Sequence, residues 1–417
     1  MSKKILFITF HFPPYNCIGA VRTGKTVKIL NELGYDVKVV TAKEQKLPKT
    51  LQLEVEEQNI YYSDWLDVNT PIYKFIGKEK VNAIKNNTNK NNFKSNLIKA
   101  LKSYYIKVFH TPDQHIGWYP YAKKECRKII EEEKWIPDII YSSASPYTSH
   151  LIANSISSKF RIPWIAELRD LWVDNHYRDT SFFDKYLEKK TLSKAKAIVT
   201  VSNPLKNKLE SKFDAPVFTI QNGFDAEDFN FKITKNSKNK INIVYTGAIY
   251  EGKRDPSILF KVISNNSELK KKVIIDFYGN HLLWIDELSE KYNIESNVNI
   301  HSPVSRKKAI EIQKTADILL LLTWNDPKEI GVLTGKLFEY IATQNTILGI
   351  GAVNDLASDI IRDNCFGIAS NNKDEITNFL LNFKKGSYNT SFEQREKFNR
   401  KIQIEKLAEI IDKHAIY

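Results

Sequence analysis

Short apolar segments that alternate with helical stretches restrict the fold of this chain more than any other feature. Residues 5–10 and 37–41 have the length and composition of buried strands. The stretch between them has helical character and ends near Gly34, a residue type that often follows a helix C-terminus. A strand, a helix and a second strand in this order predict parallel strands and an α/β fold.

The same alternation occurs in two successive series. A polar stretch at 231–240, rich in Lys, Asn and Ser, separates them and is expected to be a linker. Two such series predict two doubly wound, Rossmann-like domains that face each other across a cleft, with ligands at the carboxyl ends of the strands. The further expected strands are 139–142, 164–167 and 198–202 in the first series, and 243–246, 273–278, 298–300, 318–322 and 346–350 in the second.

The domain limits follow from this pattern. We expect an N-terminal domain over residues 1–225 and a C-terminal domain over 240–395. A last helix is expected from about 392 to 414, because its apolar residues recur at helical spacing. Its part at about 396–417 is expected to pack back on the first domain.

The net charge of +13 is unevenly distributed. Residues 1–200 carry 32 Lys and Arg against 21 Asp and Glu, whereas residues 201–417 carry 30 against 28. A basic first half favours an anionic partner there, such as a lipid surface, a phosphorylated lipid or nucleic acid. The alternative is a general bias towards Lys and Asn.

Several function classes receive no support from the sequence. The three cysteines stand far apart, and neither HExxH nor Asp-x-Asp occurs, so the sequence indicates no disulfide framework and no metal site. The longest apolar run is far shorter than a membrane span, and the first one is too short for a signal peptide. We therefore expect a cytoplasmic protein, soluble or peripheral on a membrane.

One segment of the sequence matches a phosphate-binding motif without its usual context. Residues 19–26, GAVRTGKT, fit the P-loop pattern, but eight residues separate them from the preceding strand, which a P-loop follows at once. We therefore favour a helix over a nucleoside triphosphatase site. A third interpretation keeps Gly19 and Ala20 functional, because a small residue at a helix N-terminus lets the backbone approach an anion.

In the second series, charged residues follow two strands. Lys253 and Arg254 come after the strand at 243–246 and would be placed to hold a diphosphate. Glu339 lies on a helix behind a glycine-containing loop that follows 318–322, where it would accept hydrogen bonds from ribose hydroxyls. A solvated turn and a surface glutamate are the alternatives.

In the first series, an acid, a base and an acid follow one strand. Glu167, Arg169 and Asp170 lie at the end of the strand at 164–167, a position more typical of site residues than of core. An internal ion pair between Arg169 and Asp170 is the alternative. The polar and aromatic loop at 112–118 would also meet a substrate.

Taken together, these segments resemble the family 4 glycosyltransferases of the GT-B fold, which are retaining enzymes that use nucleotide-sugar donors. The resemblance is closest to bacterial enzymes that build O-antigen, capsule or exopolysaccharide. The matching segments in chain order are FPP at 12–14 with Gly19, Ala20 and Arg22, ELRDLW at 167–172, VSN at 201–203, QNG at 221–223, YTG at 245–247 with Lys253 and Arg254, FYG at 277–279 and GKLFEY at 335–340.

The resemblance implies an acceptor site in the first domain and a nucleotide-sugar site, for a UDP-sugar above all, in the second. It implies no metal and no cofactor besides the donor. The residues that it implies are Lys253, Arg254, Asp170 and Glu167 for catalysis; Gly247, Gly279, Val304, Thr334, Gly335, Lys336, Leu337 and Glu339 for the donor; and Gly19, Ala20, Arg22 and Arg169 for the acceptor or phosphate loop.

The chain departs from the family pattern at three places. Many members have a second glutamate eight residues before the one matching Glu339, where this chain has Gly331, and Glu329 is out of register. Ala248 replaces an arginine that often follows the YTG strand end. A histidine often found after the strand at 139–142 is absent, with Ser143 or Ala144 in its place.

The function that the resemblance implies is transfer of a sugar to a lipid-linked or growing-glycan acceptor at the inner face of the membrane. A nucleotide-sugar 2-epimerase of the same fold is the alternative enzyme. A basic nucleic-acid-binding protein is the alternative without catalysis, although no nucleic-acid motif supports it. Residues 93–109 place aromatic and aliphatic residues beside lysines at helical spacing, which predicts a helix lying on anionic lipid.

Overall fold

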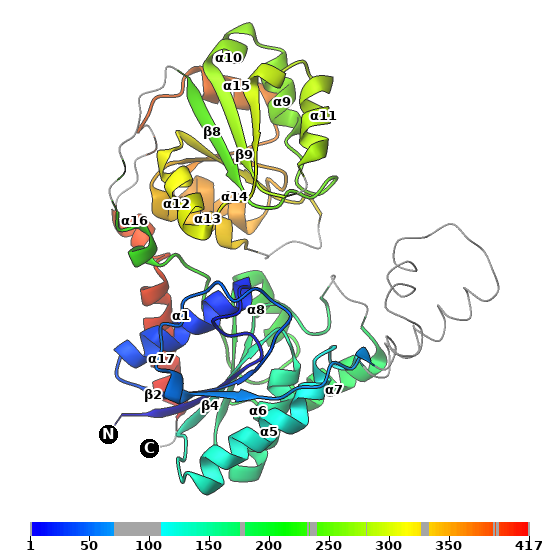
Figure 1. Cartoon of the computed structure of the whole chain (residues 1–417), viewed down its shortest axis with the longest axis vertical. Coiled ribbons are helices and arrows are strands. Elements are labelled where there is room, and N and C mark those ends of the chain that lie inside the picture. The colour runs from blue at the N-terminus through cyan, green and yellow to red at the C-terminus, as the bar shows by residue number, and fades with distance from the viewer. Residues whose placement is uncertain are drawn as a thin grey trace, which may run out of the picture. The chain divides into compact units, whose positions relative to one another are not determined.

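The computed structural model describes residues 2–70, 110–175, 180–231, 233, 240–280, 282–326, 333–386, 388 and 392–415. The chain divides into two units: unit 1 is Met1–Ile220 with Ile404–Tyr417, and unit 2 is Gln221–Gln403. Each unit is a parallel sheet covered by helices (Figure 1), which confirms the predicted fold of two doubly wound α/β domains. The predicted lipid-binding helix at 93–109, Glu329, Gly331 and most of the predicted linker lie outside the described residues.

Unit 1 holds a sheet of seven strands within its described residues. The strands are β1 (Lys4–Thr9), β2 (Asp36–Ala42), β3 (Ile60–Ser63), β4 (Ile139–Ala144), β5 (Trp164–Leu168), β6 (Ala197–Thr200) and β7 (Val217–Thr219). Their order is β3-β2-β1-β4-β5-β6-β7, and all neighbours are parallel. The chain thus reverses its direction of winding between β1 and β4, which makes their carboxyl ends the switch point of the sheet.

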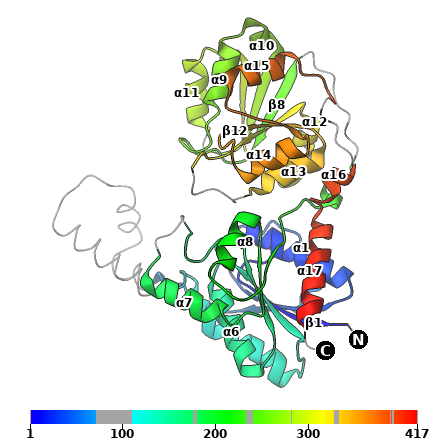
Figure 2. The same ribbon diagram turned by 180° about the vertical axis from the view of Figure 1, so that it is seen from behind.

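Helices cover both faces of this sheet. They are α1 (Ile18–Glu32), α5 (Tyr119–Arg127), α6 (Thr148–Phe160), α7 (Phe182–Leu192), α8 (Asn203–Glu210) and α17 (Arg400–His414). Side chains of α1 and α17 pack on one face, and those of α5, α6, α7 and α8 pack on the other. Figures 1 and 2 show these helices around the sheet from opposite sides. Because both faces are covered, the central strands are buried at nearly every position.

Unit 2 repeats this plan with six strands in its described residues. They are β8 (Ile241–Thr246), β9 (Val273–Tyr278), β10 (Val298–His301), β11 (Ile318–Leu322), β12 (Thr346–Ile350) and β13 (Gly367–Ala369). Their order is β10-β9-β8-β11-β12-β13, again parallel throughout. The switch point therefore lies between β8 and β11.

The helices of unit 2 also form two layers. They are α9 (Ser257–Ser264), α10 (Ser267–Lys272), α11 (Leu283–Lys291), α12 (Arg306–Thr315), α13 (Gly335–Thr343), α14 (Leu356–Asp363), α15 (Lys373–Leu381) and α16 (Phe392–Glu396). Side chains of α9, α10, α11 and α15 pack on one face, and those of α12, α13 and α14 pack on the other. Polar caps begin several of them, for example Ser305 before α12 and Asp355 before α14.

The P-loop alternative is wrong, because Gly19–Thr26 lies entirely inside α1. A P-loop would need a turn there to present its amides to a phosphate. Lys25 instead pairs with Glu54 at 2.7 Å on the side of the helix. The helical interpretation of this segment is confirmed.

The final helix is interrupted, contrary to the sequence-based expectation of one helix over 392–414. Phe224 forms backbone hydrogen bonds with Phe398 and Arg400, at 3.1 and 2.8 Å. These bonds pull the chain out of helical geometry and separate α16 from α17. The apolar periodicity extends over both helices and carries no trace of this pairing.

Candidate functional site

In unit 2, polar groups gather at the carboxyl ends of β8 and β11, the switch point of the sheet. Gly247 follows β8 with φ at +108°, a conformation that favours glycine. A Cβ atom at this position would lie 3.0 Å from Nζ of Lys336, so glycine also leaves room for that side chain. Lys336 is the second residue of α13, directly after the predicted loop residues Thr334 and Gly335.

The ammonium group of Lys336 is buried against an aromatic ring. Its ammonium lies 4.0 Å from the centroid of the Tyr245 ring and donates a 2.6 Å hydrogen bond to the Tyr245 hydroxyl. That hydroxyl donates in turn to the carbonyl of Ala248 at 2.8 Å. Burial lowers the pKa of Lys336 to about 7, the nearby charge of Arg254 lowers it too, and Glu339 acts in the opposite direction. A cation held this way gains stability when an anion arrives.

The two predicted cations lie in the loop after β8. Lys253 is exposed and its ammonium stands 4.3 Å from the centroid of the Trp324 ring. Arg254 is half-buried, donates to the carbonyl of Ala248 at 3.3 Å and packs on the Tyr250 ring. Arg254 and Lys336 thus both approach the end of β8, whereas Lys253 lies towards the segment after β11.

Glu339 lies on α13, and its carboxylate already accepts hydrogen bonds from two neighbouring side chains. Its Oε1 atom accepts from Arg306 at 3.0 Å, and Arg306 also contacts Asp228 at 2.9 Å. Gln313 donates to its Oε2 atom at 3.4 Å. A carboxylate has about four acceptor positions, so two bonds leave capacity for a ligand hydroxyl.

Sequence reasoning missed several residues of this region. Arg306 begins α12 just beyond the carboxyl end of β10, so the rule that selected Lys253 and Arg254 would have selected it as well. Tyr245 belongs to the matching segment YTG at 245–247 but was given no role of its own, because an aromatic residue inside a strand suggests core.

The other residues predicted to bind the nucleotide-sugar donor differ in exposure and position. Val304 is 38% exposed in the loop after β10, and Gly279 follows β9. Leu337 is fully buried in the core, and its backbone amide donates to the carbonyl of Thr334 at 3.2 Å.

In unit 1, Arg22 and Glu167 form a buried ion pair. Two guanidinium nitrogens of Arg22 donate to Oε1 of Glu167 at 3.0 and 2.8 Å, and the Ser143 hydroxyl donates to Oε2 at 2.5 Å. Arg22 also donates to the carbonyl of Ile220 at 2.9 Å. The side chains are only 4% and 2% exposed, so the pair connects α1, β4, β5 and the chain after β7 from inside.

Arg169 lies beside this pair and binds the backbone where β4 ends. Its guanidinium donates to the carbonyls of Ala144 and Ser145 at 2.8 and 2.7 Å. Gly19 permits this placement, since a Cβ atom there would stand 2.6 Å from the guanidinium. Ala20, the next residue of α1, is fully buried, and Asp170 is half-buried beyond β5. The structure therefore brings Gly19, Arg22, Glu167 and Arg169 together at the carboxyl edge.

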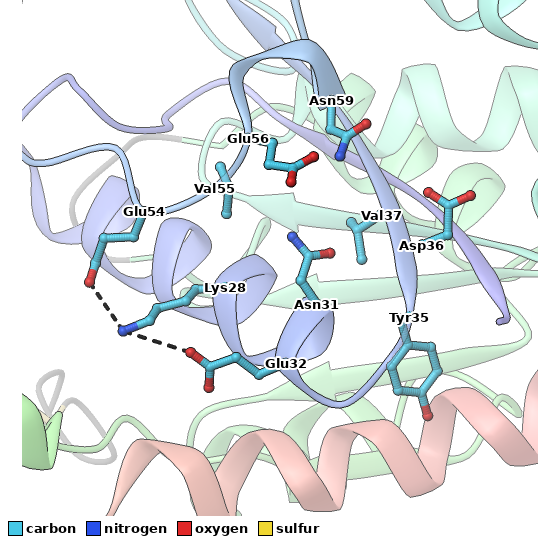
Figure 3. Close-up of a pocket in the computed structure, with 10 residues that line it drawn as sticks. All are labelled: Lys28, Asn31, Glu32, Tyr35, Asp36, Val37, Glu54, Val55, Glu56 and Asn59. Carbon is cyan, nitrogen blue, oxygen red and sulfur yellow. Dashed lines mark hydrogen bonds and ion pairs between the residues drawn. The ribbon is translucent and has the colours of Figure 1, made fainter.

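A separate hollow of about 340 Å³ lies in unit 1 (Figure 3). Lys28, Glu54 and Tyr35 are among its lining residues, from the end of α1 and the segments around β2. Lys28 pairs with Glu54 and Glu32 across it. The hollow is next to the amino end of β2, away from the edge where ligands of such sheets bind, and we do not assign it to the site.

No group of three or more His, Cys, Asp or Glu that would hold a metal ion occurs in the part of the chain that the structure describes. Among the same residues, no helix is both long and apolar enough to cross a membrane.

Comparison with known sequences finds a family match for part of the chain. Residues 21–228 match the model of Glycosyltransferase Family 4. The uncharacterized glycosyltransferase MJ1069 of Methanocaldococcus jannaschii is 25% identical over 211 residues, which cover 48% of this chain and 52% of that protein. The chain therefore spans about half the length of this curated relative.

Solved structures match nearly the whole chain. A glycosyltransferase from Rickettsia africae superposes with a TM-score of 0.62 at 16% identity, over 99% of this chain and 98% of its own. Anabaena Alr3699/HepE in complex with UDP gives 0.63 at 11% identity, over 98% and 100%.

The fold is GT-B. The family match and the relative support a glycosyltransferase. The matched family segment covers most of unit 1 and the first residues of unit 2.

Replacement of Glu167 by glutamine should cost stability. It leaves the Arg22 cation buried without its counter-charge, for which we expect a loss of about 3 kcal/mol in the free energy of unfolding by urea. The control is Glu131→Gln, which removes a surface partner of Lys159 and Arg127 and should leave the free energy of unfolding nearly unchanged.

The same variant has a pH signature. Burial acts to raise the pKa of Glu167, but Arg22 and Ser143 outweigh it and hold the pKa below the usual 4.5. Because the folded pKa is depressed, this stabilisation is present above about pH 4.5 and is lost as the pH falls. Wild type should lose more stability on acidification than Glu167→Gln, and equal losses would contradict the assignment.

Lys336 should take up a proton when UDP binds. Its unliganded pKa of about 7 rises beside a diphosphate, so affinity should fall as the pH rises through 7. Calorimetry in buffers of different ionisation enthalpy should show uptake of nearly one proton per bound UDP at pH 8. At pH 7 the uptake should be about half a proton, because half of the lysines already carry it. Lys336→Met should abolish the uptake and the exposed Lys308→Met should keep it; UDP binding without uptake in wild type would contradict the prediction.

Proposed function

We propose that this protein is a retaining glycosyltransferase that moves a sugar from a nucleotide sugar, a UDP-sugar first of all, to a lipid-linked or growing-glycan acceptor. The observation that carries the proposal is the convergence of Arg254, Lys336 and the N-terminus of α13 at the switch point of unit 2. Structural relatives that contain UDP and UDP-glucose support a nucleotide-sugar donor. The acceptor class follows from the resemblance to enzymes of surface polysaccharide synthesis.

The proposed chemistry uses side chains and backbone amides of this chain. When the bond between the sugar and the diphosphate breaks, negative charge grows on the leaving phosphate. Lys253, Arg254, Lys336 and the free amides at the start of α13 would stabilise that charge. Glu339 would accept from the ribose hydroxyls while it remains paired with Arg306. Retention would follow from attack on the face that the diphosphate leaves, and no covalent nucleophile is then required.

In unit 1, the predicted residues have different parts in this proposal. The carboxylate of Glu167 is buried against Arg22, so we assign it to positioning α1 and not to contact with the acceptor. Arg169 and Asp170 are nearer the surface and are proposed to face the acceptor.

The alternative, a nucleotide-sugar 2-epimerase, makes a different product. An epimerase changes the sugar of the nucleotide sugar with no acceptor present, whereas a transferase leaves that sugar unchanged or hydrolyses it slowly. Product analysis without acceptor therefore separates the two activities.

The donor site is tested by removal of its cations. A panel of UDP-, GDP- and ADP-sugars is first screened by thermal shift, since a ligand of the native state raises its stability. Lys253→Ala with Arg254→Ala should then lower kcat/KM by about a hundredfold or more. The matched control is Lys271→Ala with Lys272→Ala, two exposed lysines at the end of α10. Near-normal turnover by the folded double variant would refute the site.

We also propose that unit 1 docks on anionic lipid at the inner face of the membrane. The helix α7 exposes Phe182, Phe183 and Tyr186 at 80%, 71% and 56%. Lys185, Lys189 and Lys190 are exposed on the same helix. Its two acids face inward: Asp184 caps the helix, and Glu188 accepts from the backbone of Val173. Aromatic rings beside lysines, without an exposed acid, suit an anionic lipid interface.

Vesicle sedimentation tests this docking. The full chain should bind vesicles of phosphatidylcholine with phosphatidylglycerol, bind phosphatidylcholine alone poorly, and dissociate as salt is added. Phe182→Ser with Phe183→Ser should weaken binding about tenfold or more, since two rings no longer enter the interface. Leu283→Ser, which removes an apolar side chain exposed at 84% on α11, is the control. Equal binding by all three proteins would contradict the proposal.

A further inference from the structure

Another hollow lies in unit 2, at the end of α13 opposite to Lys336. It has a volume of about 500 Å³ and is bordered by the short helix η4 (Ala226–Phe229), the C-terminal end of α13 and α16 (Figure 2). All of its lining residues belong to unit 2. At about 1.5 Å per residue, the nine residues of α13 extend over roughly 13 Å, so the hollow is separate from the cations at the start of that helix.

Apolar side chains form part of the wall of this hollow. Phe224, Phe229 and Ile341 line it and are at most 9% exposed, and the half-buried Ala342 lies beside them. They belong to the hydrophobic cluster that packs on one face of the sheet of unit 2. A hollow of this size, with apolar side chains and a few polar groups, is typical of a site for a small molecule.

One polar group in the wall is a buried cation. Arg395 is only 4% exposed, and its guanidinium lies 5.2 Å from the centroid of the Phe366 ring. Burial lowers the pKa of Arg395 to about 10, so the group is still charged at neutral pH. No carboxylate among the described residues forms an ion pair with it. A buried charge without a counter-charge is rare, because removal of an ion from water is costly.

The guanidinium of Arg395 also has hydrogen-bond donors that the protein does not use. Its Nη1 atom donates to the carbonyl of Ile341 at 2.6 Å, at the end of α13, where the helix dipole offers a partial negative charge. Its Nε and Nη2 atoms form no hydrogen bond to any described residue. These two nitrogens form an edge with which arginine binds a carboxylate or a phosphate through two parallel bonds. One nitrogen therefore caps α13, and the other two remain for a ligand.

Three further charged side chains line the hollow. Lys314 donates to two backbone carbonyls at 2.8 and 2.5 Å. Glu396 is half-buried and accepts from a neighbouring side chain at 3.1 Å, and Glu227 is exposed to solvent. These charges are bonded to the protein or hydrated, whereas Arg395 is neither paired with an acid of the described residues nor exposed. An acidic group of a ligand would therefore gain most from Arg395.

We propose that this hollow binds a small organic anion, whose carboxylate or phosphate group pairs with Arg395 and whose apolar part lies against Phe224 and Phe229. The bound anion supplies the counter-charge that the fold does not provide, and it thereby recovers part of the cost of burying the cation. This site is independent of the donor site at the start of α13, so the inference goes beyond the proposed function.

Calorimetry with two naphthalene compounds tests the site in the full chain. 1-Naphthoate and 1-naphthyl phosphate join an acidic group to an apolar ring system, and they distinguish a carboxylate ligand from a phosphate ligand. At least one of them should bind with one molecule per chain, and saturating UDP should not displace it. The uncharged 1-naphthamide should bind about tenfold more weakly or worse, because it lacks the charge that pairs with the arginine.

Two variants assign the binding to this hollow. Arg395→Met removes the charge and keeps an apolar stem, so the affinity for the anion should fall about tenfold or more. The matched control is Arg362→Met on α14, because that arginine also donates to a backbone carbonyl but is exposed and paired with Asp359. Since Arg395 caps α13, a second variant leaves it in place: Ala226→Trp puts an indole into the hollow from an exposed position and should also weaken binding about tenfold or more.

Three results would overturn the inference. They are the absence of binding of both anions to wild type up to about 10 mM, a concentration at which even a weak specific site is occupied, displacement of the bound anion by UDP, and wild-type affinity in folded Arg395→Met or folded Ala226→Trp. Binding of one anion per chain that both variants weaken and Arg362→Met does not would establish the site.

Discussion

Parallel pairing of every neighbouring strand is the constraint on which the rest of this molecule depends. It forces each strand to end at the same edge as its neighbours, and it requires crossover helices that bury both faces of the sheet. Polar residues are then concentrated where the strands end. In both units, the residues of chemical interest lie beside the strand pair where the winding reverses, β1 and β4 in unit 1 and β8 and β11 in unit 2.

The two edges hold charge in different ways. In unit 1, Arg22 and Glu167 neutralise each other inside the protein and leave Arg169 as the cation nearer the surface. In unit 2, Lys336 lies against an aromatic ring, with a second cation close by. A buried pair satisfies both of its charges internally, so that removal of either partner destabilises the fold, whereas a desolvated cation costs free energy that a bound anion recovers. This difference supports the proposed place of the donor in unit 2, and the resemblance implies the acceptor in unit 1.

Much of the fold could be predicted from the sequence, because the central strands are apolar runs bounded by polar residues. The strands it did not reveal, β3, β7 and β13, are edge strands of only three or four residues, too short to show a pattern. The charged residues after β5 and β8 could also be found, since they directly follow a recognisable strand. Their partners could not, because Arg22 and Glu167 are 145 residues apart in the chain.

The sequence by itself determined the two α/β domains, the edges at which ligands would bind and the residue types available there. Only the tertiary structure decided what each residue does. In the folded protein, Glu167 forms a buried ion pair with Arg22. Lys336 donates a hydrogen bond to Tyr245, and Glu339 forms an ion pair with Arg306. The physical reason is that a pKa, a tautomer or a buried charge depends on neighbours in space, which a linear pattern does not contain.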